Sequence, residues 1–349
     1  MAGSRQRESV ANEVVDVRQA FGFSLALLLS YGVARAGEER APSGGDVKKA
    51  IERGAALRKQ AGFVPGAPQK YALVMLARGV RCGHAVLEVS DAKGEGGATY
   101  KLVESFKAGM ADEGQTALID YHGTFCMGPS LGLLSGELRT RSEINDTAQG
   151  KQQHLTLTES LSVKDDTLTW RITEQKGEAK EPTVKESKKL PLYGVRPIPK
   201  NALFCLMAFA GAAAKDGWQP DPKNALCVPT LDSGWELESP TIEPSWVAFD
   251  APAPGDPKGT AVRVRVCALV GEVTAKGLEV ETPAEAVWQA QQSWPLDAQG
   301  RPLAHPMPPD ERITVQTSDP ATLDVNAPLD LAKIGAAMKA NKPKEQKKE

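Results

Sequence analysis

The sequence lacks most of the short motifs by which catalytic and metal sites are recognised. It has no Gly-rich phosphate loop, no HExxH zinc motif and no CxxC pair. Without CxxC, a thioredoxin-like redox site or a zinc knuckle is not expected. Histidine occurs only four times, at His84, His122, His154 and His305. The sequence therefore predicts no catalytic, cofactor-binding or metal site.

Long hydrophobic runs are also missing. A membrane-spanning helix needs about 20 apolar residues. The uncharged run Phe21–Ala34 is shorter than this, and the mostly apolar run from Ala202 to Ala214 is shorter still. The second run suits a helix buried in a protein core. We therefore expect no transmembrane span in the mature chain.

The N-terminal 36 residues have the features of a cleavable secretory signal. Arg5, Arg7 and Arg18 precede the apolar run, and the small-x-small site that ends at Ala36 follows it. This pattern predicts cleavage between Ala36 and Gly37 and export to a periplasm or to the extracellular space. No cysteine lies near this site, so an acylated lipoprotein is not expected. An uncleaved anchor and a buried helix are the alternatives.

The charges are nearly balanced. Four of the 42 basic and three of the 44 acidic residues lie in residues 1–36, which leaves 38 Lys and Arg against 41 Asp and Glu. A nucleic-acid-binding protein usually has a strongly basic patch. The sequence shows none, so nucleic acid is not an expected partner.

The chain has five cysteines, which is an odd number. In an oxidising compartment this allows up to two disulfides and one free thiol. Cys205 and Cys227 flank a loop rich in Gly, Asp and Pro and are the candidate pair. Such a closed loop would stabilise the fold by about 3 kcal/mol. The alternative is that all five are buried free thiols.

Alternating apolar and polar residues predict a mainly β fold with a few helices. The clearest case is a hairpin in which residues 154–163 and 167–173 alternate about a turn at 164–166. A second hairpin is expected for residues 70–89, with Arg78 and Gly79 at its turn. Short loops between such strands imply antiparallel neighbours. We therefore expect residues 70–325 to form one antiparallel β domain.

Other segments complete the expected domain organisation. Residues 37–69 form a polar lead-in with a helix at 45–60, and residues 326–349 form a C-terminal helix at 328–340 with a charged tail. A charged loop is expected at 174–189 and a buried Ala-rich helix at 201–214. The Pro-rich residues 239–258 are expected to cross a sheet edge or to link two halves of the sheet, joined near 190–258. Further strands are expected at 98–106, 117–125, 133–141, 261–273, 278–280 and 312–317, with a short helix at 282–291 and a hairpin at 293–303.

Three groups of side chains are candidate sites. Cys82 and His84 lie two apart on one strand, a spacing that places both on one face, but a packed thiol and a surface or capped imidazole explain them better than catalysis does. His122 and Cys126 are too few for a zinc site, which needs three or four ligands. The six tryptophans could line a groove, although packing in the core explains them better. They are Trp170, Trp218, Trp235, Trp246, Trp288 and Trp294.

The order of these features resembles the exported half-barrel proteins of the periplasmic lipoprotein-carrier type and related uncharacterised envelope families. The features are the signal, the early hairpin with Gly79 and Gly83, the long amphipathic strands and the late hairpin containing Asp297–Arg301. This resemblance covers residues 70–320 and implies a curved sheet, a half-barrel or β-wrap, with a concave apolar face packed on the Ala-rich helix. It transfers no ligand-binding residue to this chain.

Two kinds of function remain open from the sequence. The first is an exported, non-enzymatic envelope protein whose curved sheet binds a hydrophobic small molecule or an envelope protein. The second is an exported hydrolase that cleaves envelope polymers with a pair of carboxylates, which requires no short motif. A purely structural interaction module with an uncovered strand edge is a third reading. The oligomeric state is not predicted.

Overall fold

The computed structural model describes the β domain and the helices on either side of it. The described residues are 44–60, 69–92, 94, 97–112, 114–146, 150–177, 179, 181–199, 225–232, 240–280, 292–296, 303 and 313–339. The predicted signal with its cleavage site at Ala36 and Gly37, the Ala-rich helix at 201–214, the helix at 282–291, the hairpin tip at 297–300 and the charged tail lie outside them. None of the described helices is long and apolar enough to cross a membrane.

The described chain is mainly β, as the sequence predicts. A nine-stranded antiparallel sheet has the order β16-β1-β2-β3-β4-β5-β6-β7-β8, and a five-stranded sheet has the order β15-β12-β11-β10-β9. The strands of the large sheet are β1 (Gln69–Ala77), β2 (Val80–Asp91), β3 (Tyr100–Asp112), β4 (Gln115–Met127), β5 (Leu133–Asp146), β6 (Lys151–Lys164), β7 (Thr167–Lys176), β8 (Thr183–Pro191) and β16 (Ile313–Ser318). Those of the small sheet are β9 (Ile198–Pro199), β10 (Leu226–Asp232), β11 (Thr241–Asp250), β12 (Val262–Ala268) and β15 (Gln292–Leu296).

Two tight turns fix the register of the large sheet. Arg78 and Gly79 join β1 to β2, and Asp165 and Asp166 join β6 to β7; all four have positive φ angles. Two successive residues with positive φ match the right-handed twist of the strands they connect. Both hairpins are confirmed as predicted from the sequence. β16 pairs with β1, so the predicted strand near residues 312–317 completes one edge of the sheet.

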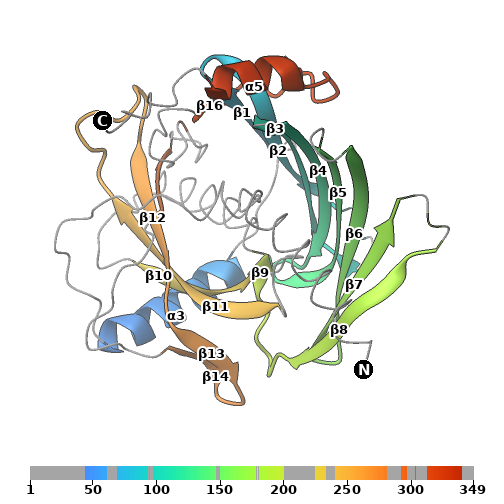
Figure 1. The fold of residues 1–349 in the computed structure, drawn as a ribbon. Helices are drawn as coiled ribbons and strands as arrows, with labels where there is room; N and C mark the ends of the chain where they lie inside the picture. Colours follow the sequence, from blue (N-terminus) through green and yellow to red (C-terminus); the bar gives the residue numbers. More distant parts are fainter. Residues whose placement is uncertain are drawn as a thin grey trace, which may run out of the picture.

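The large sheet is curved, and its concave face carries the main hydrophobic core (Figure 1). Leu102, Phe125, Leu161 and Trp170 project from β3, β4, β6 and β7 into this core. Residues of the five-stranded sheet, such as Phe249, belong to the same buried cluster. The two sheets therefore share one core, and the predicted curved antiparallel sheet is confirmed.

Helix α3 (Gly44–Gln60) covers the other face of the five-stranded sheet. Its residues Val47 and Ala50 lie in a cluster with Cys227 and Trp246. The helix approaches β10 closely at Gly54, where an added Cβ would lie 2.5 Å from the Cys227 carbonyl oxygen. A two-stranded ribbon of β13 (Gly271–Thr274) and β14 (Gly277–Val280) extends this side of the molecule.

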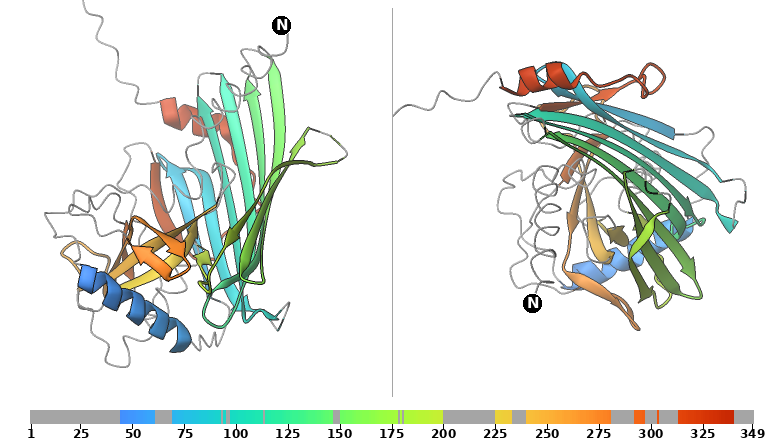
Figure 2. Two further views of the ribbon diagram at one scale, coloured as in Figure 1. Left: turned by 90° about the horizontal axis from the view of Figure 1, so that it is seen from below. Right: turned by 45° about the vertical axis from the view of Figure 1, so that its right-hand side comes forward.

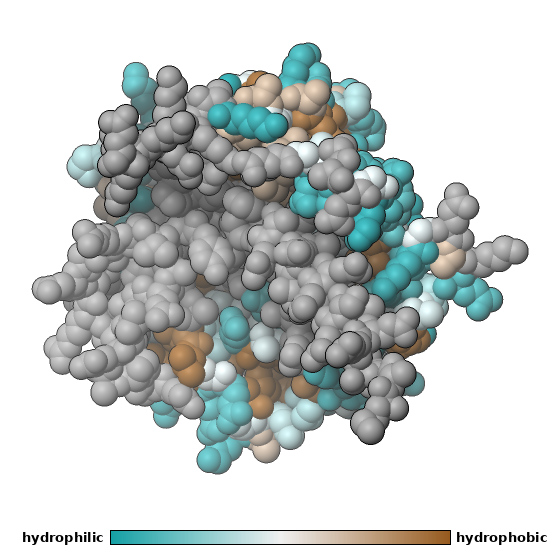
Figure 3. Space-filling view, viewed as in Figure 1, coloured by the Kyte–Doolittle hydropathy of each residue, from teal (hydrophilic) through white to brown (hydrophobic). Residues whose placement is uncertain are grey.

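Helix α5 (Leu331–Lys339) lies on the convex face of the large sheet, over β1 to β3 (Figure 1). Gly109 allows this contact, because a Cβ added to Gly109 would lie 2.6 Å from Leu331 Cδ2. In the space-filling view, hydrophilic and hydrophobic residues lie side by side at the top of the molecule, where Figure 1 places α5 (Figure 3).

Gly109→Val is expected to push α5 away from the sheet. The larger side chain overlaps Leu331 and Leu329, and overpacking of this kind costs about 1–3 kcal/mol. Limited proteolysis should then cut residues 319–339 faster than in the wild type. Thr124→Val, on the convex face of β4, is the control and should leave the cleavage rate unchanged. Equal cleavage of wild type and Gly109→Val would show that α5 does not depend on this contact.

Several segments differ from the sequence-based interpretation. The strand expected at 261–273 is divided into β12 and β13, which belong to different sheets, and β9 and β10 were not expected as strands. The charged stretch 174–189 was expected to be a loop, but residues 183–191 form β8, which pairs with β7. The Pro-rich stretch 239–258 was expected to be a linker or an edge crossing, but residues 241–250 form β11, which lies between β10 and β12.

Candidate functional site

A group of neighbouring apolar side chains on the concave face is only partly buried. It consists of Ala108, Met110, Tyr121, Ile144 and Leu155, from β3, β4, β5 and β6. Strand register places these residues on three consecutive rows of one face, around the buried side chains of Ala117 and Ile119 on β4. At this end the long strands β3 to β6 extend past the five-stranded sheet (Figure 2). We call these five residues the concave patch.

A buried carboxylate borders the concave patch. Glu104 projects from β3 on the concave face and is 1% exposed. The Tyr121 hydroxyl donates a hydrogen bond to Glu104 Oε2 over 2.9 Å. Burial, followed by the Glu104 charge, raises the pKa of Tyr121 well above its ordinary value, so Tyr121 stays a donor. Gly123 makes room for this arrangement, since an added Cβ would lie 2.9 Å from the Tyr121 hydroxyl oxygen.

A second buried carboxylate lies on the same face. Glu159 on β6 is 4% exposed and accepts a 2.6 Å hydrogen bond from the indole nitrogen of Trp170. The Glu159 charge also raises the pKa of Tyr121. Glu104 and Glu159 therefore flank the tyrosine on the concave face, each serving as acceptor for an aromatic donor.

The sequence contains a signal for both buried carboxylates. Glu159 falls between Leu157 and Leu161, in phase with the apolar positions of β6. Glu104 falls in the same way between Leu102 and Phe106 of β3. A charged residue in the apolar phase of a strand is either paired inside the core or part of a site.

The structure separates Cys82 from His84. A β-bulge opposite Met75 and Leu76 leaves Cys82 without a register partner and interrupts the alternation. Cys82 lies in a hydrophobic cluster with Met75, as expected for a packed thiol. His84 is 2% exposed rather than at the surface, and its Nδ1 lies 2.8 Å from Arg81 Nη2.

His122 and Cys126 lie on the convex face of β4. The strand neighbours of His122 are Ser105 and Arg139, and those of Cys126 are Lys101 and Ser135. Within the described ranges, no three His, Cys, Asp or Glu residues lie close enough together to hold a metal ion.

The described thiols are free. Cys82 and Cys227 are buried and Cys126 is partly exposed. Burial raises the pKa of Cys82, and it raises that of Cys227 to about 12. Cys227 is thus a free thiol where the sequence suggests a disulfide, while its predicted partner Cys205 lies outside the described residues. The Cys205–Cys227 bond stays a prediction.

The three thiols are expected to differ in reactivity. Only the thiolate reacts with iodoacetamide, so at pH 8 the native protein should be alkylated at Cys126 well before Cys82 or Cys227. Peptide mass spectrometry at successive times measures this order, and unfolding in denaturant should make all three reactive. A Cys227 that reacts as fast as Cys126 would contradict its burial. A Cys227 that stays blocked in denaturant without reductant would instead support the predicted Cys205–Cys227 disulfide.

The tryptophans with described side chains do not line one groove. Trp170 lies in the core between the two sheets, whereas Trp246 lies on the α3 side of the five-stranded sheet. The side chains of the other four lie outside the described part of the structure. Packing in the core therefore accounts for Trp170 and Trp246.

Residues Gly128–Gly132 read GPSLG, which has the G-x-S-x-G spacing of a nucleophile elbow. An elbow requires a turn from a strand into a helix. Here the segment joins the antiparallel strands β4 and β5, and the residue with positive φ is Leu131 rather than Ser130. The Ser130 carbonyl oxygen accepts a hydrogen bond from Arg58. The segment serves as a structural turn.

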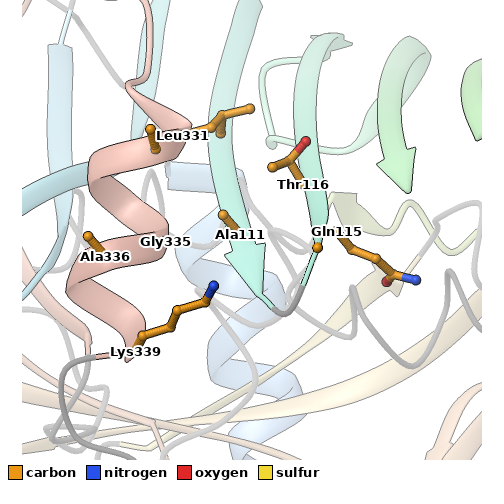
Figure 4. Close-up of a pocket in the computed structure, with 9 residues that line it drawn as sticks. Ala111, Gln115, Thr116, Leu331, Gly335, Ala336 and Lys339 are labelled. Carbon is orange, nitrogen blue, oxygen red and sulfur yellow. The ribbon is translucent and has the colours of Figure 1, made fainter. Parts of the chain in front are cut away.

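A surface groove of about 400 Å³ lies between α5 and the β3–β4 turn (Figure 4). Small side chains form it, including Ala111, Gly335 and Ala336, and Lys339 extends from the last turn of α5 toward β3. The groove results from the close approach of α5 to the sheet.

Comparison with known proteins gives little to assign. No protein-family model matches the chain, and no curated protein matches it. The chain is similar to a crystal structure of a β-barrel-like protein of domain of unknown function DUF1849 from Brucella abortus. The match has a TM-score of 0.37 and 10% identity, and covers 72% of this chain and 93% of that one. Neither family nor function follows from a likeness this distant.

Proposed function

We propose that this protein is an exported, non-enzymatic binding protein of the cell envelope that holds a hydrophobic molecule against the concave patch. The observation that carries the proposal is the partial exposure of five neighbouring apolar side chains on the concave face. Exposed apolar surface on a curved scaffold is typical of ligand sites. The signal-like N-terminus and the resemblance to half-barrel carriers agree with this function.

The buried carboxylates give the patch a defined shape. The hydrogen bond from Tyr121 to Glu104 fixes the aromatic ring at the border of the patch. The bond from Trp170 to Glu159 fixes the neighbouring part of the core. A rigid surface loses less conformational entropy when a ligand binds.

Two adjacent substitutions on β6 test the proposal. Leu155 belongs to the concave patch, and Thr156 lies on the convex face; both side chains are partly exposed. The probe is N-phenyl-1-naphthylamine, an uncharged hydrophobic fluorophore. We expect the wild type to bind the probe saturably and Thr156→Glu to have no effect. Leu155→Glu should weaken binding at least about tenfold, because the new carboxylate would have to lose its hydration when the probe covers it.

Two outcomes oppose the proposal. Absence of saturable binding by the wild type would remove the site. Equal loss in both variants, with unchanged circular dichroism, would place the probe elsewhere. If instead an envelope protein competes with the probe at Leu155, the same patch binds a protein partner.

A hydrolase is the second candidate, and the shared face of Glu104 and Glu159 is the observation that favours it. Paired carboxylates can cleave glycosidic bonds. Release of soluble fragments from purified envelope polymers, abolished by both Glu104→Gln and Glu159→Gln, would support it. Turnover that survives both changes would exclude these residues as the catalytic pair.

A further inference from the structure

His84 occupies a buried position between the large sheet and the segment that leads to α5. It projects from the convex face of β2 and is 2% exposed. Its strand neighbours are Val74 on β1 and Lys107 on β3, and Asp120 follows Lys107 on β4. The segment 319–330, which connects β16 to α5, approaches it at Asp324.

One arginine joins His84 to this segment. Arg81 Nη2 lies 2.8 Å from His84 Nδ1 and donates a 2.7 Å hydrogen bond to the Asp324 carbonyl oxygen. An arginine can only donate, so Nδ1 must be the acceptor and the imidazole must be neutral. Arg81 Nε is buried and has no hydrogen-bond partner in the described structure. The Arg81 side chain is thus positioned by these two acceptors.

Local hydrogen bonds fix the conformation of residues 319–330 around the Asp324 carbonyl group. The Asp324 carboxylate accepts a hydrogen bond from the Asn326 backbone N–H, which forms a local turn. Beyond it, Asp330 accepts from the Lys333 N–H at the start of α5. The Arg81 contact therefore fastens residues 319–330 at Asp324, seven residues before α5 begins at Leu331.

We propose that His84 and Arg81 form an acid-sensitive latch that holds residues 319–339 on the convex face and releases them when His84 is protonated. A protonated imidazole carries a hydrogen on both nitrogens and cannot accept from Arg81. It also places a second positive charge beside Arg81, with Lys107 on the neighbouring strand. Arg81 then loses His84 as an acceptor and is repelled by the charged imidazole, which weakens its remaining hydrogen bond to the Asp324 carbonyl oxygen.

The charges around His84 set the pH at which release occurs. Burial first, and then Arg81 and Lys107, lower its pKa to about 4, while Asp120 and Asp324 oppose this shift. In the released state the imidazole regains an ordinary pKa near 6.5. Above pH 6.5 it is neutral in both states and the latch is fully stable. As the pH falls from 6.5 toward 4, the released state takes up the proton first, so the latch weakens.

Hydrogen exchange of the mature protein tests the latch. After correction for the intrinsic pH dependence of exchange, protection in residues 319–339 should fall about 20-fold between pH 7 and pH 5, as linkage requires for this difference in pKa. Protection in β5 and β6 should not change. His84→Gln keeps an acceptor for Arg81 but cannot be protonated, so it should remove the pH dependence.

A matched histidine provides the control. His154 is exposed on β6 and lies 3.9 Å from Glu143; His154→Gln should leave the pH profile of residues 319–339 unchanged. In the wild type, the NMR titration of the His84 ring should have its midpoint near pH 4. A wild-type profile equal to that of His84→Gln would overturn the proposal. So would loss of protection throughout the molecule at one pH, or a His84 midpoint near 6.5.

Discussion

Trp170→Ala is expected to lower the free energy of unfolding by about 3–5 kcal/mol. Trp170 has no exposed surface and lies at the centre of the core shared by the two sheets. Its replacement removes a large apolar side chain and leaves a cavity. It also removes the indole N–H that donates to the buried carboxylate of Glu159. Chemical denaturation followed by circular dichroism measures the change.

Two variants separate the packing from the hydrogen bond. Trp170→Phe keeps most of the ring but leaves Glu159 without its indole donor, and should cost about 1–3 kcal/mol. Val184→Ala, on β8 of the same sheet, removes a side chain that is 53% exposed and should cost less than about 0.5 kcal/mol. A Trp170→Ala protein as stable as Val184→Ala would show that the two sheets do not share a core at this residue.

Arg58→Ala is expected to lower the free energy of unfolding by about 2–4 kcal/mol. Arg58 lies near the end of α3 and is 9% exposed. Its Nε donates to the Ser130 carbonyl oxygen, and its Nη2 donates to that of Arg196, on the segment joining the two sheets. Burial lowers the pKa of Arg58 to about 10, and at neutral pH the charge is held by these carbonyl groups. Arg58→Ala removes the side-chain donor from both carbonyl groups, at the junction where α3 meets the turn at Ser130 and the segment at Arg196.

The same junction provides the comparisons. Arg58→Lys keeps the charge, but its single ammonium group lacks the forked geometry that reaches both carbonyl groups. Its stability should therefore lie between those of the wild type and Arg58→Ala. Lys49→Ala changes an exposed residue of the same helix and should cost less than about 0.5 kcal/mol. If Arg58→Ala and Lys49→Ala unfold at the same denaturant concentration, Arg58 does not join α3 to the two loops.

The hairpins of the large sheet could be predicted because their signal is local. In β6, Leu155, Leu157 and Leu161 share one face, and the turn at Asp165 and Asp166 follows at once. Each strand of this region reaches its partner through a short connection. The apolar period therefore indicates both the strand and the face that is buried.

Four strands were not predicted: β9 and β10 lie where no strand was expected, and β8 and β11 were missed for opposite reasons. β8 is an edge strand with both faces largely exposed, so its Lys-rich sequence has no apolar period. β11 is buried on both faces over residues 244–249 and contains Pro244. Pro244 faces Pro229 of β10, and pairing with β12 stops at Ser245 while pairing with β9 begins at Thr230. Pro229 therefore has no partner on β9, and Pro244 has none on β12. Because neither proline interrupts the pairing with these outer strands, the sheet tolerates both.

The concave patch could not be predicted from the sequence. Met110, Tyr121, Ile144 and Leu155 come from four strands and become neighbours only through the register of the sheet. Their partial exposure depends on where the five-stranded sheet ends, which is a tertiary property. The bulge at Cys82 likewise could not be read from spacing, because it changes which side chains share a face.

Native mass spectrometry of the protein purified from the envelope fraction of its own host tests the central claim most directly. One spectrum reports both the N-terminus and any bound mass. We predict a chain that begins at Gly37 and carries a lipid-sized adduct that organic extraction removes, with the adduct lost in Leu155→Glu and kept in Thr156→Glu. A bare chain under gentle ionisation, or an adduct kept by Leu155→Glu, would contradict a hydrophobic ligand on the concave patch.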